Sequence, residues 1–102
     1  MALREEILQF LSDHKEELFD KYQLVKIGLF GSYSRNAANE KSDIDILVEF
    51  KTNTQHLALK KEEIKSIIKS KFNKDVDICR EKYIKPYFKD QIIGSAIYVW
   101  KG

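Results

Sequence analysis

Length, composition and charge already exclude several classes of protein. The chain has 102 residues, 43% of them hydrophobic, and one proline, so we expect a single globular domain over residues 1–102 that buries about two-thirds of the surface of its unfolded chain. The formal net charge of +2 is too small to indicate nucleic-acid binding by bulk electrostatics, and the lone Cys79 excludes an internal disulfide.

The same features indicate a compartment. With one cysteine and no spacing typical of a zinc site, the chain fits a reducing environment. The N-terminus MALREEILQFL carries acidic residues early and lacks a cleavable signal pattern, and no apolar run is long enough to cross a bilayer. We therefore expect a cytoplasmic protein.

The N-terminal region is predicted to be helical. Apolar residues recur at helical spacing, first over residues 3–11 and then over residues 18–22, with charged residues outside the apolar stripe. This pattern fits one long helix or two. Asp13 and Glu16 have the spacing of a capping box, so Ser12-Asp13 is the predicted start of a second segment.

A strand, a turn and a second strand are predicted over residues 24–50. The segment LVKIGLF is short, apolar and partly β-branched, which favours a largely buried strand over residues 24–30. The chain then turns at Gly31-Ser32 and opens a short helix. Glycine lets the backbone approach a ligand closely, Ser32 can offer its hydroxyl and helix N–H groups to phosphate oxygens, and Arg35 follows one turn later as a bidentate phosphate donor.

Asp43 and Asp45 stand at the start of the second predicted strand. Because side chains alternate along a strand, both carboxylates point to one face, opposite Ile44. Two neighbouring carboxylates repel each other unless a cation lies between them, and Mg²⁺ prefers oxygen ligands and leaves part of its shell for phosphates. A bare D-x-D is more often a solvated pair at a strand start, but its combination with the glycine–serine turn favours a metal site.

A polar segment and a basic helix follow. Asn53 or Thr54 is the predicted cap of a helix that runs to about Ser70. Its predicted buried stripe consists of Leu57, Ile64, Ile67, Ile68 and Phe72. Seven lysines and two glutamates lie over residues 51–74. We interpret them as a solvated helix face, and the alternative is a surface that attracts an acidic partner or a polyphosphate.

A third strand is predicted over residues 75–79. Val76 and Ile78 face one way along it, while Asp75 and Asp77 face the other. Asp75 is interpreted as a solvated residue at the strand start. Cys79 ends an apolar run and is expected to be a small core residue.

The C-terminal region reads as a turn, a helix and an apolar end. Pro86 suits the first turn of a helix that Gly94-Ser95 ends, and residues 96–100 form a short strand or an apolar tail. Aromatic residues concentrate here: Tyr83, Tyr87, Phe88, Tyr98 and Trp100. Packing is the default explanation, and a surface for a partner is the alternative.

The central stretch resembles a known family. Gly31-Ser32, followed after ten residues by Asp43-Ile44-Asp45, resembles the signature of the polymerase-β-like nucleotidyltransferase superfamily. The segment GSYSRNAANEKSDIDILVEF is most similar to the minimal nucleotidyltransferases (MNT), small domains usually encoded beside a HEPT protein as a toxin–antitoxin pair. The resemblance runs from about Leu3 to the C-terminus. It implies an α/β (α+β) fold, a small mixed sheet with helices packed on it.

One position departs from the family pattern. The family usually has glycine after the arginine of the turn, whereas this chain has Asn36. Asparagine tolerates the left-handed backbone better than most other residues, so we expect the turn to be kept.

The resemblance also implies an activity. It is the transfer of AMP from ATP to a hydroxyl acceptor, the expected acceptor being a tyrosine of a cognate HEPT toxin. Two Mg²⁺ ions would be held by Asp43, Asp45 and Asp77, because a two-metal site needs a third carboxylate and Asp77 matches the position of the family's third acid. Asp77 would also draw the proton from the attacking hydroxyl. The phosphates would be bound by Gly31, Ser32 and Arg35.

Two other functions stay open. The chain could be a non-catalytic antitoxin that neutralises its partner by binding alone; the intact set of three acids argues against a decayed site. For either function a homo-oligomer or a hetero-oligomer is possible. Nucleic-acid binding through residues 51–74 is the weaker alternative, and it would show an affinity that falls steeply with salt.

Overall fold

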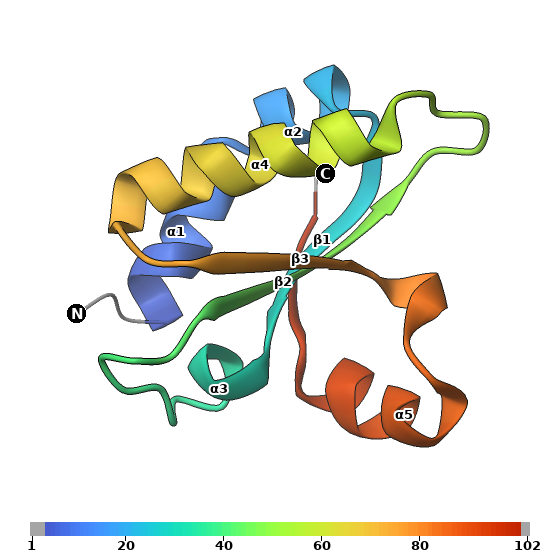
Figure 1. The fold of residues 1–102 in the computed structure, drawn as a ribbon. Helices are drawn as coiled ribbons and strands as arrows, with labels where there is room; N and C mark the ends of the chain where they lie inside the picture. Colours follow the sequence, from blue (N-terminus) through green and yellow to red (C-terminus); the bar gives the residue numbers. More distant parts are fainter. Residues whose placement is uncertain (1–3, 101–102) are drawn as a thin grey trace.

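The computed structural model describes residues 4–100, apart from the side chains at positions 88, 89, 91 and 93. It has one four-stranded sheet with helices on both faces (Figure 1). In chain order the elements are α1 (Arg4–Asp13), α2 (Lys15–Lys21), β1 (Leu24–Phe30), α3 (Gly31–Ser34), β2 (Ile44–Phe50), α4 (Leu57–Phe72), β3 (Val76–Arg80), the 3-10 helix η1 (Glu81–Tyr83), α5 (Pro86–Ser95) and β4 (Ile97–Val99).

The sheet is mixed. Its strand order is β3-β2-β1-β4. β1 pairs antiparallel with β2 and with β4, whereas β2 pairs parallel with β3. A parallel pair needs a long crossover connection, and here α4 provides it by running back over one face of the sheet (Figure 1). The predicted α/β fold with a small mixed sheet is therefore confirmed, and the apolar C-terminal segment is a strand rather than a tail.

The core lies between the sheet and the layer formed by α1, α2 and α4 (Figure 1). Each strand points every second side chain into it. The buried cluster consists of Ile7, Leu11, Leu18, Phe19, Tyr22, Leu24, Ile27, Leu29, Tyr33, Ile44, Ile46, Val48, Phe50, Ile64, Ile68 and Val76. The alternate positions face the other side of the sheet, where the helices α3 and α5 lie (Figure 1).

The two N-terminal helices begin and end differently from the prediction. The chain forms two helices, but Asp13 does not cap the second, because it is the last residue of α1 and its Oδ1 accepts a hydrogen bond of 2.7 Å from Gln9 Nε2. His14 occupies the N-cap position without a side-chain capping bond, and its Nδ1 lies 2.9 Å from the carbonyl oxygen of Phe10. The predicted capping box is therefore wrong.

The start of α4 also differs. The helix runs from Leu57 to Phe72, and its N-cap is His56 in the left-handed region, with a φ of 59°. Thr54 does not cap it, because its hydroxyl donates to the carbonyl oxygen of Lys51 at 2.6 Å and closes the preceding turn. At the other end Asn73 takes the left-handed C-cap conformation, with a φ of 55°. The predicted apolar stripe is confirmed, with Ile64 and Ile68 fully buried.

Several C-terminal aromatic side chains are exposed. The exposed fraction is 70% for Tyr83 and Tyr87 and 55% for Trp100, so these side chains are not part of the core, although the Trp100 ring lies 5.5 Å from that of Tyr98. Tyr98 does pack, because β4 places it over Gly28, where an added Cβ would lie 2.8 Å from its ring. The side chain of Phe88 lies outside the described part of the structure.

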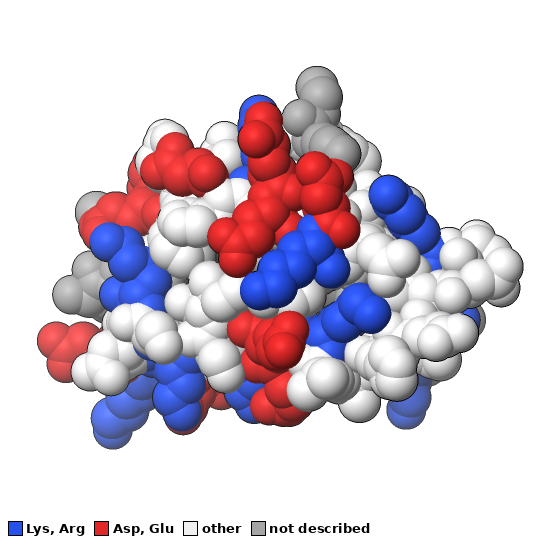
Figure 2. Space-filling view, turned by 90° about the horizontal axis from the view of Figure 1, so that it is seen from above, with Lys and Arg blue, Asp and Glu red and all other residues white. Residues whose placement is uncertain are grey.

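Charges of both signs are interspersed over the face of the molecule on which α2 and α4 lie (Figure 2). Lys69 forms a 3.3 Å ion pair with Asp75, and Lys60 donates to the carbonyl oxygen of Gln55. This mixture favours the interpretation of residues 51–74 as a solvated face. No helix within the described residues is long and apolar enough to span a membrane.

Candidate active site

The site begins where β1 ends. After Phe30 the chain turns at Gly31, whose φ of 74° lies in the left-handed region. A Cβ at this position would lie 2.3 Å from Oδ2 of Asp45, which is far closer than any real contact. Glycine is therefore required at position 31 for two reasons: the backbone conformation and the close approach of Asp45.

The short helix α3 continues from this glycine. The Ser34 hydroxyl donates to the carbonyl oxygen of Gly31 at 2.7 Å, and the Ala37 N–H donates to that of Ser32 at 2.8 Å. Asn36 has a φ of 58°, so it adopts the left-handed conformation that glycine adopts easily. The expectation that the turn survives asparagine is confirmed.

Two of the three predicted acids lie side by side on neighbouring strands. In the sheet register Phe30 is opposite Asp45, and Asp45 is opposite Asp77. Residues in register point to the same face, so both carboxylates project from the face that carries α3 and α5. The third acid, Asp43, is exposed. It lies just before β2, because this strand begins at Ile44, one residue later than predicted.

The acids interact electrostatically. Partial burial, together with the negative charges of Asp77 and Asp43, raises the pKa of Asp45 from 3.8 to about 6, and the Arg35 guanidinium opposes this rise. Neighbouring like charges raise the pKa of a carboxyl group in this way when no cation lies between them. The charge of Arg35 therefore acts on Asp45, and its role as a phosphate donor stays a prediction.

The three predicted acids are the candidate ligands for Mg²⁺. No group of three His, Cys, Asp or Glu side chains in the described part of the chain is placed to hold a metal ion, so the three acids do not form a ready-made set of ligands. Asp45 and Asp77 are nevertheless opposite each other on neighbouring strands. Because Mg²⁺ completes its shell with water and substrate phosphates, a pair of neighbouring carboxylates fits this ion.

Comparison with known proteins identifies the family. The sequence profile of the nucleotidyltransferase domain matches residues 11–99. The chain belongs to the nucleotidyltransferase domain family. A Methanocaldococcus jannaschii protein assigned as a protein adenylyltransferase is 42% identical over 95 residues, which covers 92% of this chain and 95% of the relative. The predicted membership and the predicted enzyme class are thus confirmed.

Solved structures share the fold. The structure of an assigned minimal nucleotidyltransferase superposes with a TM-score of 0.68 at 28% identity and covers 88% of this chain and 93% of that one. A toxin–antitoxin structure with AMP-PNP superposes with a TM-score of 0.66 at 24% identity and covers 89% of this chain and 73% of that one. At the lower identity the likeness shows the fold alone.

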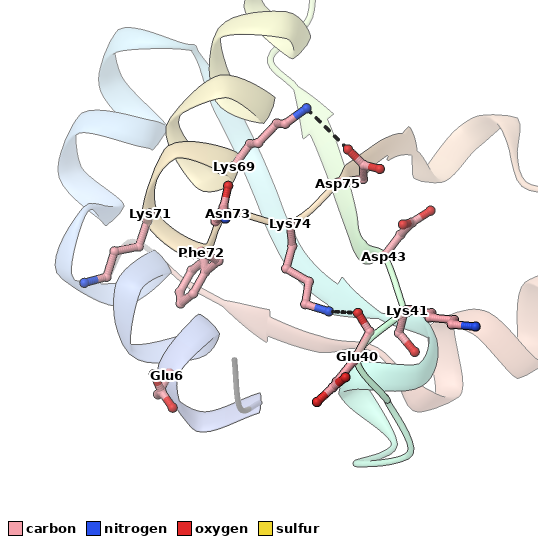
Figure 3. A pocket seen from close by; sticks show the side chains of 11 residues that line it. Glu6, Glu40, Lys41, Asp43, Lys69, Lys71, Phe72, Asn73, Lys74 and Asp75 are labelled. Carbon is pink, nitrogen blue, oxygen red and sulfur yellow. Dashed lines mark hydrogen bonds and ion pairs between the residues drawn. The ribbon is translucent and has the colours of Figure 1, made fainter. Parts of the chain in front are cut away.

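A cavity of about 800 Å³ adjoins Asp43 in this nucleotidyltransferase (Figure 3). Its charged lining residues are Glu6, Glu40, Lys41, Asp43, Lys69, Lys71, Lys74 and Asp75. Figure 3 shows Lys74 donating to the backbone carbonyl of Glu40 and Lys69 paired with Asp75. Positive and negative groups are equal in number around the cavity, so its charge does not select for an anion.

The position of Cys79 in this nucleotidyltransferase differs from the prediction. It is exposed rather than in the core. Partial burial, followed by the charges of Asp77 and Asp45, raises the pKa of its thiol, so it lies on the same face as the acids. The alternation along β3 could have found this, because Cys79 is two residues beyond Asp77; the apolar neighbours concealed it.

Proposed function

We propose that this nucleotidyltransferase moves AMP from ATP to a tyrosine hydroxyl of a cognate HEPT toxin and thereby acts as its antitoxin. The observation that carries the proposal is the register of Asp45 and Asp77 beside the left-handed Gly31. The adenylyltransferase assignment of the M. jannaschii relative supports protein as the acceptor. The toxin–antitoxin structure with AMP-PNP supports a toxin partner and an adenine nucleotide.

The phosphate tail binds at the turn. The backbone of Gly31 carries no side chain to obstruct a phosphate, and Ser32, which is partly exposed, offers its hydroxyl. Arg35 is exposed and its charge acts on Asp45, so Arg35 neutralises charge on the departing pyrophosphate.

The acids hold the metal and orient the acceptor. Asp43, Asp45 and Asp77 would hold two Mg²⁺ ions, which would supply charge neutralisation at the α-phosphate when bound. Asp77 accepts the proton of the attacking tyrosine hydroxyl. The tyrosine oxygen then forms a bond to the α-phosphorus, the bond between that phosphorus and the α,β-bridging oxygen breaks, and pyrophosphate leaves.

The acceptor enters through the cavity of Figure 3. Asp43 belongs both to the acid group and to the cavity lining. The balanced charge of that lining suits a neutral phenol from a protein surface better than a triphosphate. The partner would then bring its own surface to complete the site.

Binding alone is the second candidate function. Trp100 and Tyr83 expose 55% and 70% of their surfaces, and exposed aromatic residues are typical of protein interfaces. An antitoxin of this type would mask its partner without modifying it.

Co-expression separates the two functions. The partner is produced with this protein or with its Asp43→Ala/Asp45→Ala variant and is then weighed by intact mass spectrometry. The proposal predicts added AMP masses with the parent and none with the variant. Neutralisation of the partner without a mass change would contradict the proposal and favour binding alone.

A further inference from the structure

β3 forms an open edge of the sheet next to the candidate site. The strand order is β3-β2-β1-β4, and within the described residues β3 pairs only with β2. An edge strand presents N–H and C=O groups that can pair with another extended chain. Because β3 also carries Asp77, a chain bound along its outer side would run directly beside the acids.

The direction of the free backbone groups of β3 follows from one hydrogen bond. The Ile44 N–H of β2 donates to the carbonyl oxygen of Asp75 at 2.9 Å, so the backbone groups of Asp75 point toward β2. Successive residues of a strand direct these groups to alternate sides. The N–H and C=O groups of Val76, Ile78 and Arg80 therefore point outward, away from β2.

A cavity of about 380 Å³ opens at the C-terminal end of this edge. Ile78 and Cys79 both line it, although neighbouring side chains point to opposite faces of a strand. Lys61 of α4 and Ile92 of α5 line it as well, and these two helices lie on opposite faces of the sheet (Figure 1). The cavity therefore lies at the edge of β3, between the two helix layers, and is called the edge cavity below.

The cavity of Figure 3 opens at the other end of the same edge, where Asp75 precedes β3. Asp75 lines that cavity and Cys79 lines the edge cavity. These two residues are four positions apart, which corresponds to roughly 13 Å along an extended chain. An extended segment of about five residues would therefore reach from one cavity to the other, with Asp77 midway.

The edge cavity combines apolar walls with a positive rim. Lys61 and Lys85 line it, and neither forms an ion pair with another described residue. Arg80 adds little net charge, because it pairs with Glu49 at 2.6 Å. The other walls are mostly apolar or aromatic: Phe30, Ile78, Tyr83, Ile84 and Ile92. The edge cavity therefore suits an apolar side chain that has an acidic residue near it.

We propose that the acceptor protein docks as an extended segment along the outer edge of β3, with its tyrosine beside Asp77 and an apolar side chain in the edge cavity. The proposal rests on the proposed function, because it requires a tyrosine acceptor. Backbone pairing supplies affinity in this mode of binding, and pockets for alternate side chains supply specificity. The apolar residue stands two positions from the tyrosine, opposite Cys79, and an acidic residue of the segment lies near Lys61 and Lys85.

A proline at position 78 tests the backbone contact. Proline has no N–H, and because the N–H of Ile78 points outward, Ile78→Pro keeps the hydrogen bonds to β2. Steady-state AMP transfer to the cognate toxin should show a KM for the toxin at least about tenfold higher, with AMP-PNP binding unchanged in equilibrium dialysis. Ile78→Val, the matched control, keeps the N–H and should stay within about twofold of the parent KM. An unchanged KM in a folded Ile78→Pro protein overturns the proposal.

Charge reversal at the edge cavity gives an independent test that leaves the strand intact, and it decides the question if Ile78→Pro does not fold. Lys61→Glu/Lys85→Glu should raise the KM for the toxin at least about tenfold, because the acidic residue then meets like charges. The matched control is Lys15→Glu/Lys51→Glu, at two lysines that line neither cavity, and it should change the KM less than about twofold. Equal KM values for the two double variants overturn the proposal.

The outcomes separate docking at β3 from the proposed function. If the parent adds AMP to the toxin and neither change at β3 moves the KM, the acceptor docks elsewhere, and this proposal is overturned while the proposed function stands. If the parent adds no AMP to the toxin, the proposed function fails and docking at β3 fails with it.

Discussion

Asp45 destabilises the folded protein at neutral pH. Burial and two neighbouring acids raise its pKa from 3.8 to about 6. Between these two pH values the carboxyl group holds a proton in the native state that it has lost in the unfolded chain. The free energy of unfolding therefore falls as the pH rises from about 4 through 6, and the loss is complete above that range. A residue kept at this cost to stability is typical of a functional site.

Asp45→Asn should therefore stabilise the metal-free protein at neutral pH. We expect the free energy of unfolding to rise by about 1–2 kcal/mol near pH 7.5, after allowance for solvent screening of this partly buried group, and to be nearly unchanged near pH 4. Urea unfolding with a chelator present measures both values. Equal stability of parent and variant near pH 7.5 would contradict the electrostatic picture of the acids.

Gly31 is the residue on which the geometry of the turn depends most. Gly31→Ala places a Cβ against the Asp45 carboxylate in an unfavourable backbone conformation, so we expect a loss of about 1–3 kcal/mol in the free energy of unfolding and at least a hundredfold loss of AMP transfer. The matched control is Gly94→Ala, because Gly94 lies in α5 with nothing near its added Cβ. That control should keep its activity and be slightly stabilised.

Among the elements, strands were easier to predict than helix caps. The apolar, β-branched patterns of β1 and β3 are local properties, and the structure has both strands within a residue of the predicted ranges. Caps depend on competition for single hydrogen bonds. Asp13 has capping-box spacing, but its carboxylate oxygen accepts a hydrogen bond from Gln9 instead. Likewise, the Thr54 hydroxyl closes a turn instead of capping α4.

The turn after α3 tests how closely asparagine replaces glycine. The left-handed backbone of Asn36, with a φ of 58°, should cost an alanine about 1 kcal/mol, so Asn36→Ala should lower the free energy of unfolding by about that amount and weaken nucleotide binding by displacing Arg35. Asn36→Gly should stay within about 0.5 kcal/mol of the parent.

A remote left-handed asparagine gives the control for this series. Asn53 has a φ of 67° in the loop before α4, away from the residues of the candidate site. Asn53→Ala should lower stability by a similar amount and leave nucleotide binding unchanged, as thermal unfolding and equilibrium dialysis would show. Equal binding losses in the two alanine variants would mean that the effect is global destabilisation.

At the scale of the whole molecule, the sequence predicted the ingredients of the site better than its surroundings. The glycine–serine turn and the D-x-D pattern are close in the chain, and the parallel pairing of β2 with β3 brings Asp77 into register with Asp45. The two cavities were not predictable, because each is lined by segments far apart in the sequence. The same holds for the exposed position of Cys79, which only its strand register reveals.

The most direct test of the account compares two neighbouring aspartates. Asp77 is in register with Asp45, whereas Asp75 lies before β3 and pairs with Lys69. Steady-state AMP transfer to the cognate toxin is measured for Asp77→Asn and for Asp75→Asn, two isosteric changes. We predict that Asp77→Asn loses at least about a thousandfold in kcat/KM, equivalent to about 4 kcal/mol, and that Asp75→Asn stays within about threefold of the parent. Similar activities for the two variants would contradict the assignment of the site.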